Sequence, residues 1–523
     1  MNEPCAQSLA LPGVDLESSS AAGPKAPAPA PARIKSVARS QVVFHQVDVE
    51  RLVEEDHPAR AIWELTGKVD LQPFYEPIGA VEGAAGRTPW DPRVLVSLWV
   101  YAYSRGISSA REIGRRCAYD PAFEWLCGME TINYHTLSDF RAAHGQALQD
   151  LFVEVLGVLS AQNLVSMERV MHDGTKIKAY ASSDSFRRED RLQAHLEAAR
   201  QQVQRLAQEA SEEEPARQQA ARQRAARERQ QRVDQALQEL EQVRQTKRDA
   251  KEKESARASL SDPQARVMKQ PDGGYAPSYN VQISTEASHK IIVGVGVSQN
   301  GSDYGELVGG VARVEQNLEA KPKQVVADGG FTSRENIIAL EAQGIDFVGS
   351  IGDQQAKGAS ALERSGVAPE FSGRAFTYDE AQDLYRCPAG QSLRRVGQSE
   401  SRPGVVQCQY RAEAALCQAC PFKAQCCPKA DKQGRTVTRL VEAPQVRQFR
   451  EKMQTPQAQA IYRQRAPVAE FPNAWIKAKL GLRQFRLRGL VKVGLEALWA
   501  CLTYNIQQWI RLCWRPAPAS IKN

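Results

Sequence analysis

Apolar residues recur every three or four positions between Phe44 and about residue 157, which is the spacing of helices that bury one face. The pattern predicts helices over 60–68, 92–104, 109–117, 121–127 and 137–159. Asp91-Pro92 and the pair Ser108-Ser109 stand where helix caps are expected. We therefore expect residues 41–160 to form an all-helical domain. The Ala- and Pro-rich residues 1–40 before it are typical of a disordered leader.

After residue 160 the spacing changes to that of a β-strand. An apolar run that ends in Met171 resumes as alternation over 175–181, which predicts a strand with the Asp173 carboxylate on one face. An isolated Asp-Gly pair is also typical of a hairpin turn, so Asp173-Gly174 has that second interpretation. A recurrence of the arrangement elsewhere in the chain favours a site over a turn.

The arrangement recurs at Asp328. Residues 325–327 predict a buried strand that ends at Asp328, and Ser333 is expected to cap a helix over 334–343. Other strands are predicted over 279–283, 291–295 and 347–351, and another helix over 304–318. Two carboxylates on adjacent strands repel each other unless a divalent cation bridges them. The sequence therefore predicts an acidic site for a divalent cation.

Glu470 is the candidate for a third acidic ligand. It lies in a series with Tyr462, Arg465 and Lys477 that enters a predicted helix. Glu470 and Lys477 are about two helical turns apart, so they are expected to share one face.

Three groups of residues resemble the signature of the DDE transposases of bacterial insertion sequences. They are His172-Asp173-Gly174-Thr175-Lys176, Ala327-Asp328-Gly329-Gly330-Phe331, and the series Tyr462, Arg465, Glu470 and Lys477. The resemblance covers nearly all of residues 40–512 and is to the insertion sequence 1182 type, which has a Tyr-Arg-Glu-Lys signature. One difference follows the glutamate, where the family usually has Pro and then a Phe-Gly pair. This chain has Phe471-Pro472-Asn473-Ala474 there.

The resemblance implies an α+β fold, in which an RNase H-like core of a mixed sheet flanked by helices follows a DNA-binding all-α domain. In that core the first and fourth strands lie side by side. Asp173, Asp328 and Glu470 would be catalytic and would bind two Mg²⁺ (or Mn²⁺) ions. Tyr462, Arg465 and Lys477 would contact DNA. The implied activity is binding of the terminal inverted repeats, metal-dependent DNA cleavage and strand transfer.

Positive charge is concentrated near the end of the chain. The net charge is +7, and residues 475–515 contain eight basic residues and one acidic residue. Arg483, Arg486 and Arg488 alternate with apolar residues, which is typical of a surface that binds a polyanion, although a solvated helix face is the competing interpretation. With the resemblance, we expect double-stranded DNA as the partner, both element ends and target, and a homodimer on that DNA.

Two inserts interrupt the predicted core, which comprises residues 161–186, 259–351 and 460–514. Residues 187–258 are highly charged with apolar residues at four-three spacing, so they predict a coiled-coil-like antiparallel hairpin or a dimerising pair of helices. Residues 352–459 contain several cysteines. Cys417-x2-Cys420 with Cys387 and either Cys426 or Cys427 has the ligand types of a structural zinc site. Inert reduced thiols and a disulfide module are the alternatives.

Nothing in the sequence predicts export or membrane insertion. No apolar run has the length of a membrane span, and the N-terminus lacks a signal-peptide pattern. We expect a cytoplasmic protein without a membrane partner, associated with the bacterial nucleoid. Two other functions stay open on the sequence: an inactive or domesticated transposase-derived DNA-binding protein, and an RNase H-like nuclease that only hydrolyses.

Overall fold

The computed structural model describes Val42 and residues 46–79, 88–208, 215–247, 249–350, 364, 366–402, 405–428, 433–441 and 443–516. The predicted leader lies outside these ranges. The chain divides into two units, residues 1–47 and residues 48–523, and the second contains the elements below. Among the described residues, no helix has both the length and the apolar character needed to cross a bilayer.

Seven helices follow one another in the N-terminal part of the described second unit. They are α1 (Pro58–Thr66), α2 (Gln72–Tyr75), α3 (Pro92–Ser104), α4 (Ala110–Arg116), α5 (Pro121–Cys127), α6 (Tyr134–Ala143) and α7 (Gly145–Ala161). Asp91 and Ser109 cap α3 and α4 through their side chains, as predicted. The single helix predicted over 137–159 was wrong. His144 leaves the helical region of backbone space (φ −105°, ψ 57°), and its ring packs against Phe74 and Phe140.

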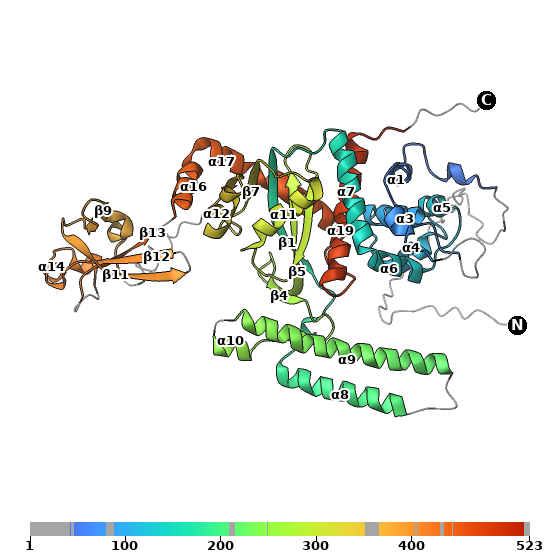
Figure 1. Cartoon of the computed structure of the whole chain (residues 1–523), viewed down its shortest axis with the longest axis horizontal. Helices are drawn as coiled ribbons and strands as arrows, with labels where there is room; N and C mark the ends of the chain where they lie inside the picture. The colour runs from blue at the N-terminus through green and yellow to red at the C-terminus, as the bar shows by residue number, and fades with distance from the viewer. Residues whose placement is uncertain are drawn as a thin grey trace, which may run out of the picture. The chain divides into compact units, whose positions relative to one another are not determined.

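A mixed sheet forms the centre of the second unit (Figure 1). Its strands are β1 (Arg169–Lys178), β4 (Arg266–Lys269), β5 (Tyr275–Glu286), β6 (Ile292–Ser298), β7 (Gln324–Ala327) and β8 (Asp346–Gly349). The order is β4-β5-β1-β7-β8, and β6 also pairs with β5. β1 is antiparallel to β5 and parallel to β7, with His172 opposite Ala327. The predicted adjacency of the strands that carry Asp173 and Asp328 is therefore confirmed.

Helices from both halves of the chain pack around this sheet. The later ones are α11 (Glu306–Leu318), α12 (Arg334–Ala342), α16 (Pro444–Gln454), α17 (Pro456–Arg463), α18 (Phe471–Ala478) and α19 (Leu490–Leu512). The apolar stripe of α19 is buried in one core with the N-terminal helices and with strands of the sheet. Trp499 donates its indole N–H to the carbonyl of Arg141 at the end of α6. The described chain is thus a mixed α+β structure.

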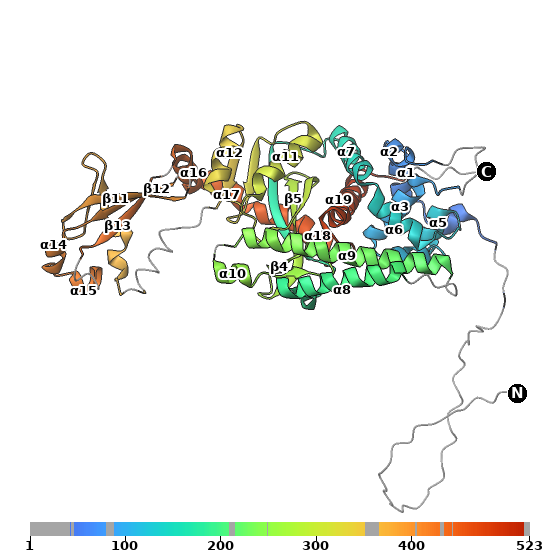
Figure 2. The same ribbon diagram turned by 60° about the horizontal axis from the view of Figure 1, so that its bottom comes forward.

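The charged insert forms a helical hairpin. It comprises α8 (Glu189–Gln208), α9 (Ala216–Gln245) and α10 (Ala250–Glu254), and the short strands β2 (Phe186–Arg187) and β3 (Ala258–Ser259) pair at its base. An Arg244–Glu189 ion pair of 2.6 Å joins the end of α9 to the start of α8, so the helices are antiparallel (Figures 1 and 2). Leu192 and Leu240 bury in one cluster within the chain. The hairpin alternative is therefore the one observed in this chain.

The cysteine-containing insert has its own antiparallel sheet of order β13-β12-β11-β10-β9. Its elements are β9 (Thr377–Asp379), β10 (Leu384–Arg386), β11 (Ser392–Arg402), β12 (Val405–Arg411), α14 (Ala414–Gln418), α15 (Lys423–Cys426) and β13 (Thr436–Val441). Phe371, Leu393 and Tyr410 lie in a small core of this insert. We call residues 366–441 the cysteine module.

Candidate active site

Asp173 lies within the central strand β1, with 15% of its side chain exposed. Asn473 donates its amide to one carboxylate oxygen at 2.9 Å, and an Arg465 guanidinium nitrogen lies 3.7 Å from the other. Burial raises the pKa of Asp173 to about 6; the nearby Asp328 and Asp303 add to this rise, whereas Arg465 opposes it. The Asp173 carboxylate is therefore a desolvated acid in a cluster of acids.

Asp328 follows the carboxyl end of β7, one step beyond the residue that faces His172. The backbone N–H of Gly330 donates to its carboxylate at 2.7 Å, which folds the glycine loop back over the strand end. A Cβ on Gly330 would lie 3.0 Å from that same oxygen, so a larger residue there would require the Asp328 carboxylate to shift by a small amount. Ser333 then caps α12 by accepting from Asn336 N–H, as predicted.

Glu470 is the last residue of a π-helical turn, Ala466–Glu470, that leads into α18. Such turns recur at functional sites because they displace side chains from helical register. The Glu470 side chain is 60% exposed, and one of its oxygens lies 3.5 Å from Arg465. Arg465 therefore pairs with both Asp173 and Glu470 and links the two acids.

Helix α18 turns one face toward Asp173. Lys477 lies one turn after Asn473 on this face, and burial lowers its pKa while the Asp173 charge opposes that fall. The sequence had marked Asn473 only as a difference from the family. Its spacing to Lys477 was the signal that it belongs to the same face.

Asp303 is a fourth acid that the sequence interpretation missed. It accepts from the side-chain amides of Asn280 (2.8 Å) and Gln282 (3.0 Å) on β5. A Cβ on Gly174 would lie 2.3 Å from an oxygen of Asp303, so the carboxylate lies directly against β1. Asp303 precedes α11 in a strand-to-helix loop, and such loops collect functional groups in sheets of this kind.

The buried His172 supports the site through hydrogen bonds. Its ring is buried between Ser284 Oγ (2.8 Å) and Gln282 Oε1 (3.0 Å) and packs edge-on against Phe331. Burial, with help from the Arg313 charge, lowers the His172 pKa to about 4, so the ring is neutral at pH 7. Since Gln282 also donates to Asp303, His172 fixes the amide that positions this acid.

The basic segment, which we define as residues 482–489, is extended and lies beside the end of β1. Phe485 N–H donates to the carbonyl of Lys178, and Lys178 N–H donates to the carbonyl of Arg483. The buried carboxylate of Glu496 accepts from the backbone N–H groups of Arg486 and Leu487. The side chains of Arg483, Arg486 and Arg488 are exposed on this segment. The segment is not helical, so the competing interpretation of a solvated helix face was wrong.

Tyr462 and the predicted zinc-binding cysteines each line a cavity. Tyr462 lies at a surface cavity whose other lining residues are Gly349, Ser350, Arg450, Met453, Gln454, Gln459 and Arg463. Cys387, Cys417, Cys420 and Cys426 line a separate cavity in the cysteine module. Within the described ranges, no three Asp, Glu, His or Cys side chains already stand as a metal-ligand set. At the Asp173 site, the Glu470 carboxylate is instead paired with Arg465.

A family model described as Transposase DDE domain matches residues 386–510, and one described as Transposase domain (DUF772) matches residues 47–143. No curated protein matches the chain. A solved piggyBac transposase synaptic complex with hairpin DNA is similar over 87% of this chain and 73% of that chain, at 10% identity. Its TM-score of 0.28 is too low to carry an argument. The two family matches support a DDE transposase.

Proposed function

We propose that this protein is a transposase of the insertion sequence 1182 type. It binds the terminal inverted repeats of its element as double-stranded DNA and catalyses metal-dependent DNA cleavage and strand transfer. The observation that carries the proposal is the convergence on Asp173. Asp328 comes from the adjacent parallel strand, while Arg465, Asn473 and Lys477 come from about 300 residues later in the chain.

The sheet topology supports an RNase H-like core. Strands β6, β5 and β1 form an antiparallel meander, and β7 and β8 follow in parallel to β1. The Glu470 turn and α18 return to the same end of β1 after the cysteine module. In this arrangement Asp173, Asp328 and Glu470 are the catalytic residues.

The donor set fits Mg²⁺ or Mn²⁺. Asp173, Asp328 and Glu470 offer hard oxygen donors, and the side-chain oxygen of the buried Asn473 has no hydrogen-bond partner among the described residues. An orphaned buried acceptor beside desolvated acids is stabilised when a cation or its bound water becomes its partner. Bound divalent cations would supply activation of the attacking oxygen and stabilisation of the departing one.

The basic residues have two roles: they pair with the acidic side chains, and they contact DNA phosphates. In the free protein Arg465 neutralises Asp173 and Glu470 together. With divalent cations bound, the Arg465 guanidinium would be available to contact the phosphate next to the scissile bond, with Lys477 on the same side. Tyr462 positions the flanking DNA, and the arginines of the basic segment contact phosphates further along the duplex.

The test is cleavage of DNA that carries the element end. Asp173→Ala, Asp328→Ala and Glu470→Ala should each lower the cleavage rate by about 10³-fold, the upper scale for loss of one preorganised electrostatic group. DNA binding should persist, because it is spread over many phosphate contacts. Asp190→Ala on the exposed start of α8 is the matched control. Cleavage at the normal rate by one of the three variants would remove that residue from the catalytic set.

Product analysis separates the proposed function from its alternatives. Joining of the cleaved end to target DNA is the expected product, whereas hydrolysis alone would indicate a nuclease. Native protein that binds element ends but never cleaves would indicate a DNA-binding descendant. Asp173→Cys or Asp328→Cys should retain some activity with Mn²⁺ and little with Mg²⁺, because a thiolate is a softer ligand.

A further inference from the structure

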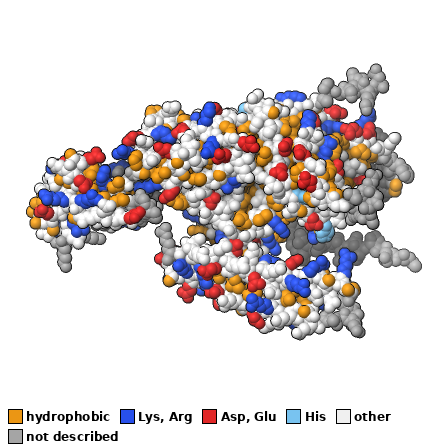
Figure 3. Space-filling model, viewed as in Figure 1, with side chains coloured by type: hydrophobic (Ala, Val, Ile, Leu, Met, Phe, Trp, Pro, Cys, Tyr) orange, Lys and Arg blue, Asp and Glu red, His pale blue; other side chains and the backbone are white. Residues whose placement is uncertain are grey.

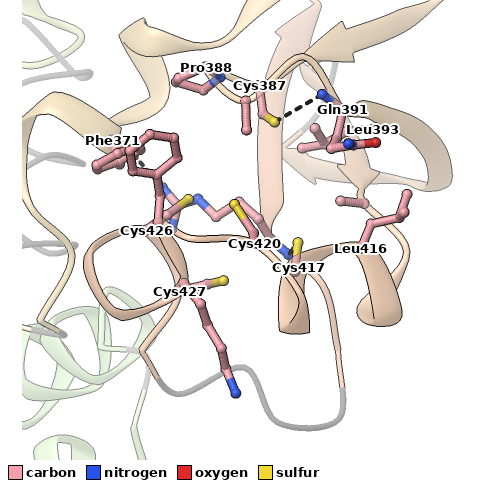
Figure 4. Close-up of a pocket in the computed structure, with 15 residues that line it drawn as sticks. Phe371, Cys387, Pro388, Gln391, Leu393, Leu416, Cys417, Cys420, Cys426 and Cys427 are labelled. Atoms are coloured by element: carbon pink, nitrogen blue, oxygen red, sulfur yellow. Dashed lines mark hydrogen bonds between the residues drawn. The ribbon is translucent and has the colours of Figure 1, made fainter.

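Five cysteines line one cavity of the cysteine module (Figure 4). Cys387 follows β10, Cys417 and Cys420 lie in and just after α14, and Cys426 and Cys427 end α15. Most of the other lining side chains are apolar and include Phe371, Leu393, Leu416 and Phe422; the polar ones are Gln391, Lys423 and Arg435. Thiols from three separate segments therefore face one largely apolar space.

The backbone around two of these cysteines donates hydrogen bonds to sulfur. Gln391 N–H donates to Cys387 Sγ at 3.3 Å across a tight turn, in which Gly390 adopts a φ of +77°. Arg435 N–H donates to Cys417 Sγ at 3.4 Å. Hydrogen bonds of this kind favour the thiolate form, which is the metal-binding form of cysteine.

Several thiolates in such a largely apolar space are stable only with a compensating multivalent cation.

We propose that the cavity binds one structural Zn²⁺ through Cys387, Cys417, Cys420 and one of the adjacent pair Cys426 and Cys427. Four thiolates from a CxxC and two further segments suit the closed tetrahedral site that zinc prefers. Each ligand thiol releases its proton to solvent as its sulfur–zinc bond forms. No three thiols in the described module already form a ligand set, so zinc uptake requires the side chains to rotate toward one centre.

This site lies outside the proposed chemistry and has a structural role. Zinc would tie the β10–β11 turn to α14 and α15 in a module whose small core contains Leu393 and Tyr410. Metal binding that joins separate segments of a small domain contributes directly to its folding. We therefore expect the module to lose its structure when zinc is removed.

The test uses the full-length protein purified under reducing conditions. Metal analysis should find about one zinc per chain, as a closed four-ligand site requires. Cys417→Ser and Cys420→Ser should each lose that zinc. The matched control is Cys408→Ala, because Cys408 is buried in the core of the same module but does not line the cavity. Retention of one zinc per chain by both serine variants would overturn the proposal.

A second measurement on the unmutated protein covers the case in which the serine variants fail to fold. A mercurial that blocks thiols should release the zinc in proportion to the thiols blocked, detected with a chromogenic chelator. Refolding with Co²⁺ in place of zinc should give the absorption of tetrahedral thiolate coordination. The proposal would be wrong if the purified protein contains no metal, stays folded, and gives no thiolate spectrum with Co²⁺. These cysteines would then be ordinary thiols without a metal.

Discussion

The Asp173 site and the cysteine cavity are assembled over very different distances in sequence. Asn473 reaches Asp173 across 300 positions, and Asp303 and Asp328 join from the second half of the core. The five cavity cysteines all lie between residues 387 and 427. The first site depends on strand register, since a shift of one residue would turn Asp173 to the other face of the sheet. The second depends on short turns, so it can form as a local unit.

The largest effect in this comparison is expected at the supporting residues of the Asp173 site. Asp303→Asn and Asn473→Ala should each lower cleavage by about 10- to 100-fold, the scale for residues that orient metal ligands. Asn473→Ala removes the amide that holds Asp173 at 2.9 Å. Cys408→Ala in the module should leave the cleavage rate unchanged. Unchanged cleavage by Asp303→Asn would show that this acid is only structural.

Two glycine-to-alanine variants, one in each region, test how closely neighbouring atoms approach the glycine. In Gly174→Ala the new Cβ would lie 2.3 Å from Asp303, so Asp303 must give up a hydrogen bond to Asn280 or Gln282. Loss of such a bond to a charged group costs about 1.5–3 kcal/mol of unfolding free energy. Gly397→Ala in β11 meets no atom within 4 Å and should change stability by less than about 0.5 kcal/mol. Scanning calorimetry measures both, and equal losses would contradict the difference in packing.

The exposed arginines of the basic segment should affect binding more than chemistry. Replacing Arg483, Arg486 and Arg488 with Ala should flatten the salt dependence of duplex binding, by about 0.9 in slope for each phosphate that is no longer neutralised. Arg217, Arg224 and Arg227 on the exposed surface of α9 form a control of equal charge. Figure 3 shows basic and acidic side chains intermixed over that hairpin. An unchanged slope in the first triple variant would remove the segment from the DNA interface.

The smallest effect is expected from removal of the helical hairpin. Replacing residues 188–257 with a short Gly/Ser linker closes the β2–β3 pair directly, and the apolar positions of the hairpin already bury within one chain. We expect the shortened protein to fold and to cleave at a similar rate, apart from the loss of the Glu239–Arg266 ion pair. Sedimentation decides its role in assembly. If the native protein sediments as a dimer and the shortened protein as a monomer, the result would support the interpretation of the insert as a dimerising pair of helices.

Hydrophobic periodicity predicted several elements of the N-terminal helical part and of the mixed sheet, but no element of the cysteine module. The helices over 92–104 and 121–127 agree with α3 and α5 at both ends, and the caps at Asp91 and Ser333 are as predicted. It did not predict the break at His144, because contacts with Phe74 and Phe140 stabilise a non-helical backbone there. The local spacing of apolar residues carries no information on packing between residues that are distant in sequence.

The sequence by itself determined which residue types were available to the site and in what order. It marked Asp173, Asp328, Glu470, Arg465 and Lys477 as candidates because the motifs that carry the family resemblance are local. Only the tertiary structure decided that Asp303 and Asn473 join them, and that Arg465 pairs with Asp173 and Glu470 at once. The physical reason is that side-chain contacts of about 3 Å depend on strand register, on the Glu470 π-turn and on the return of α18. None of these leaves a periodic signal in the sequence.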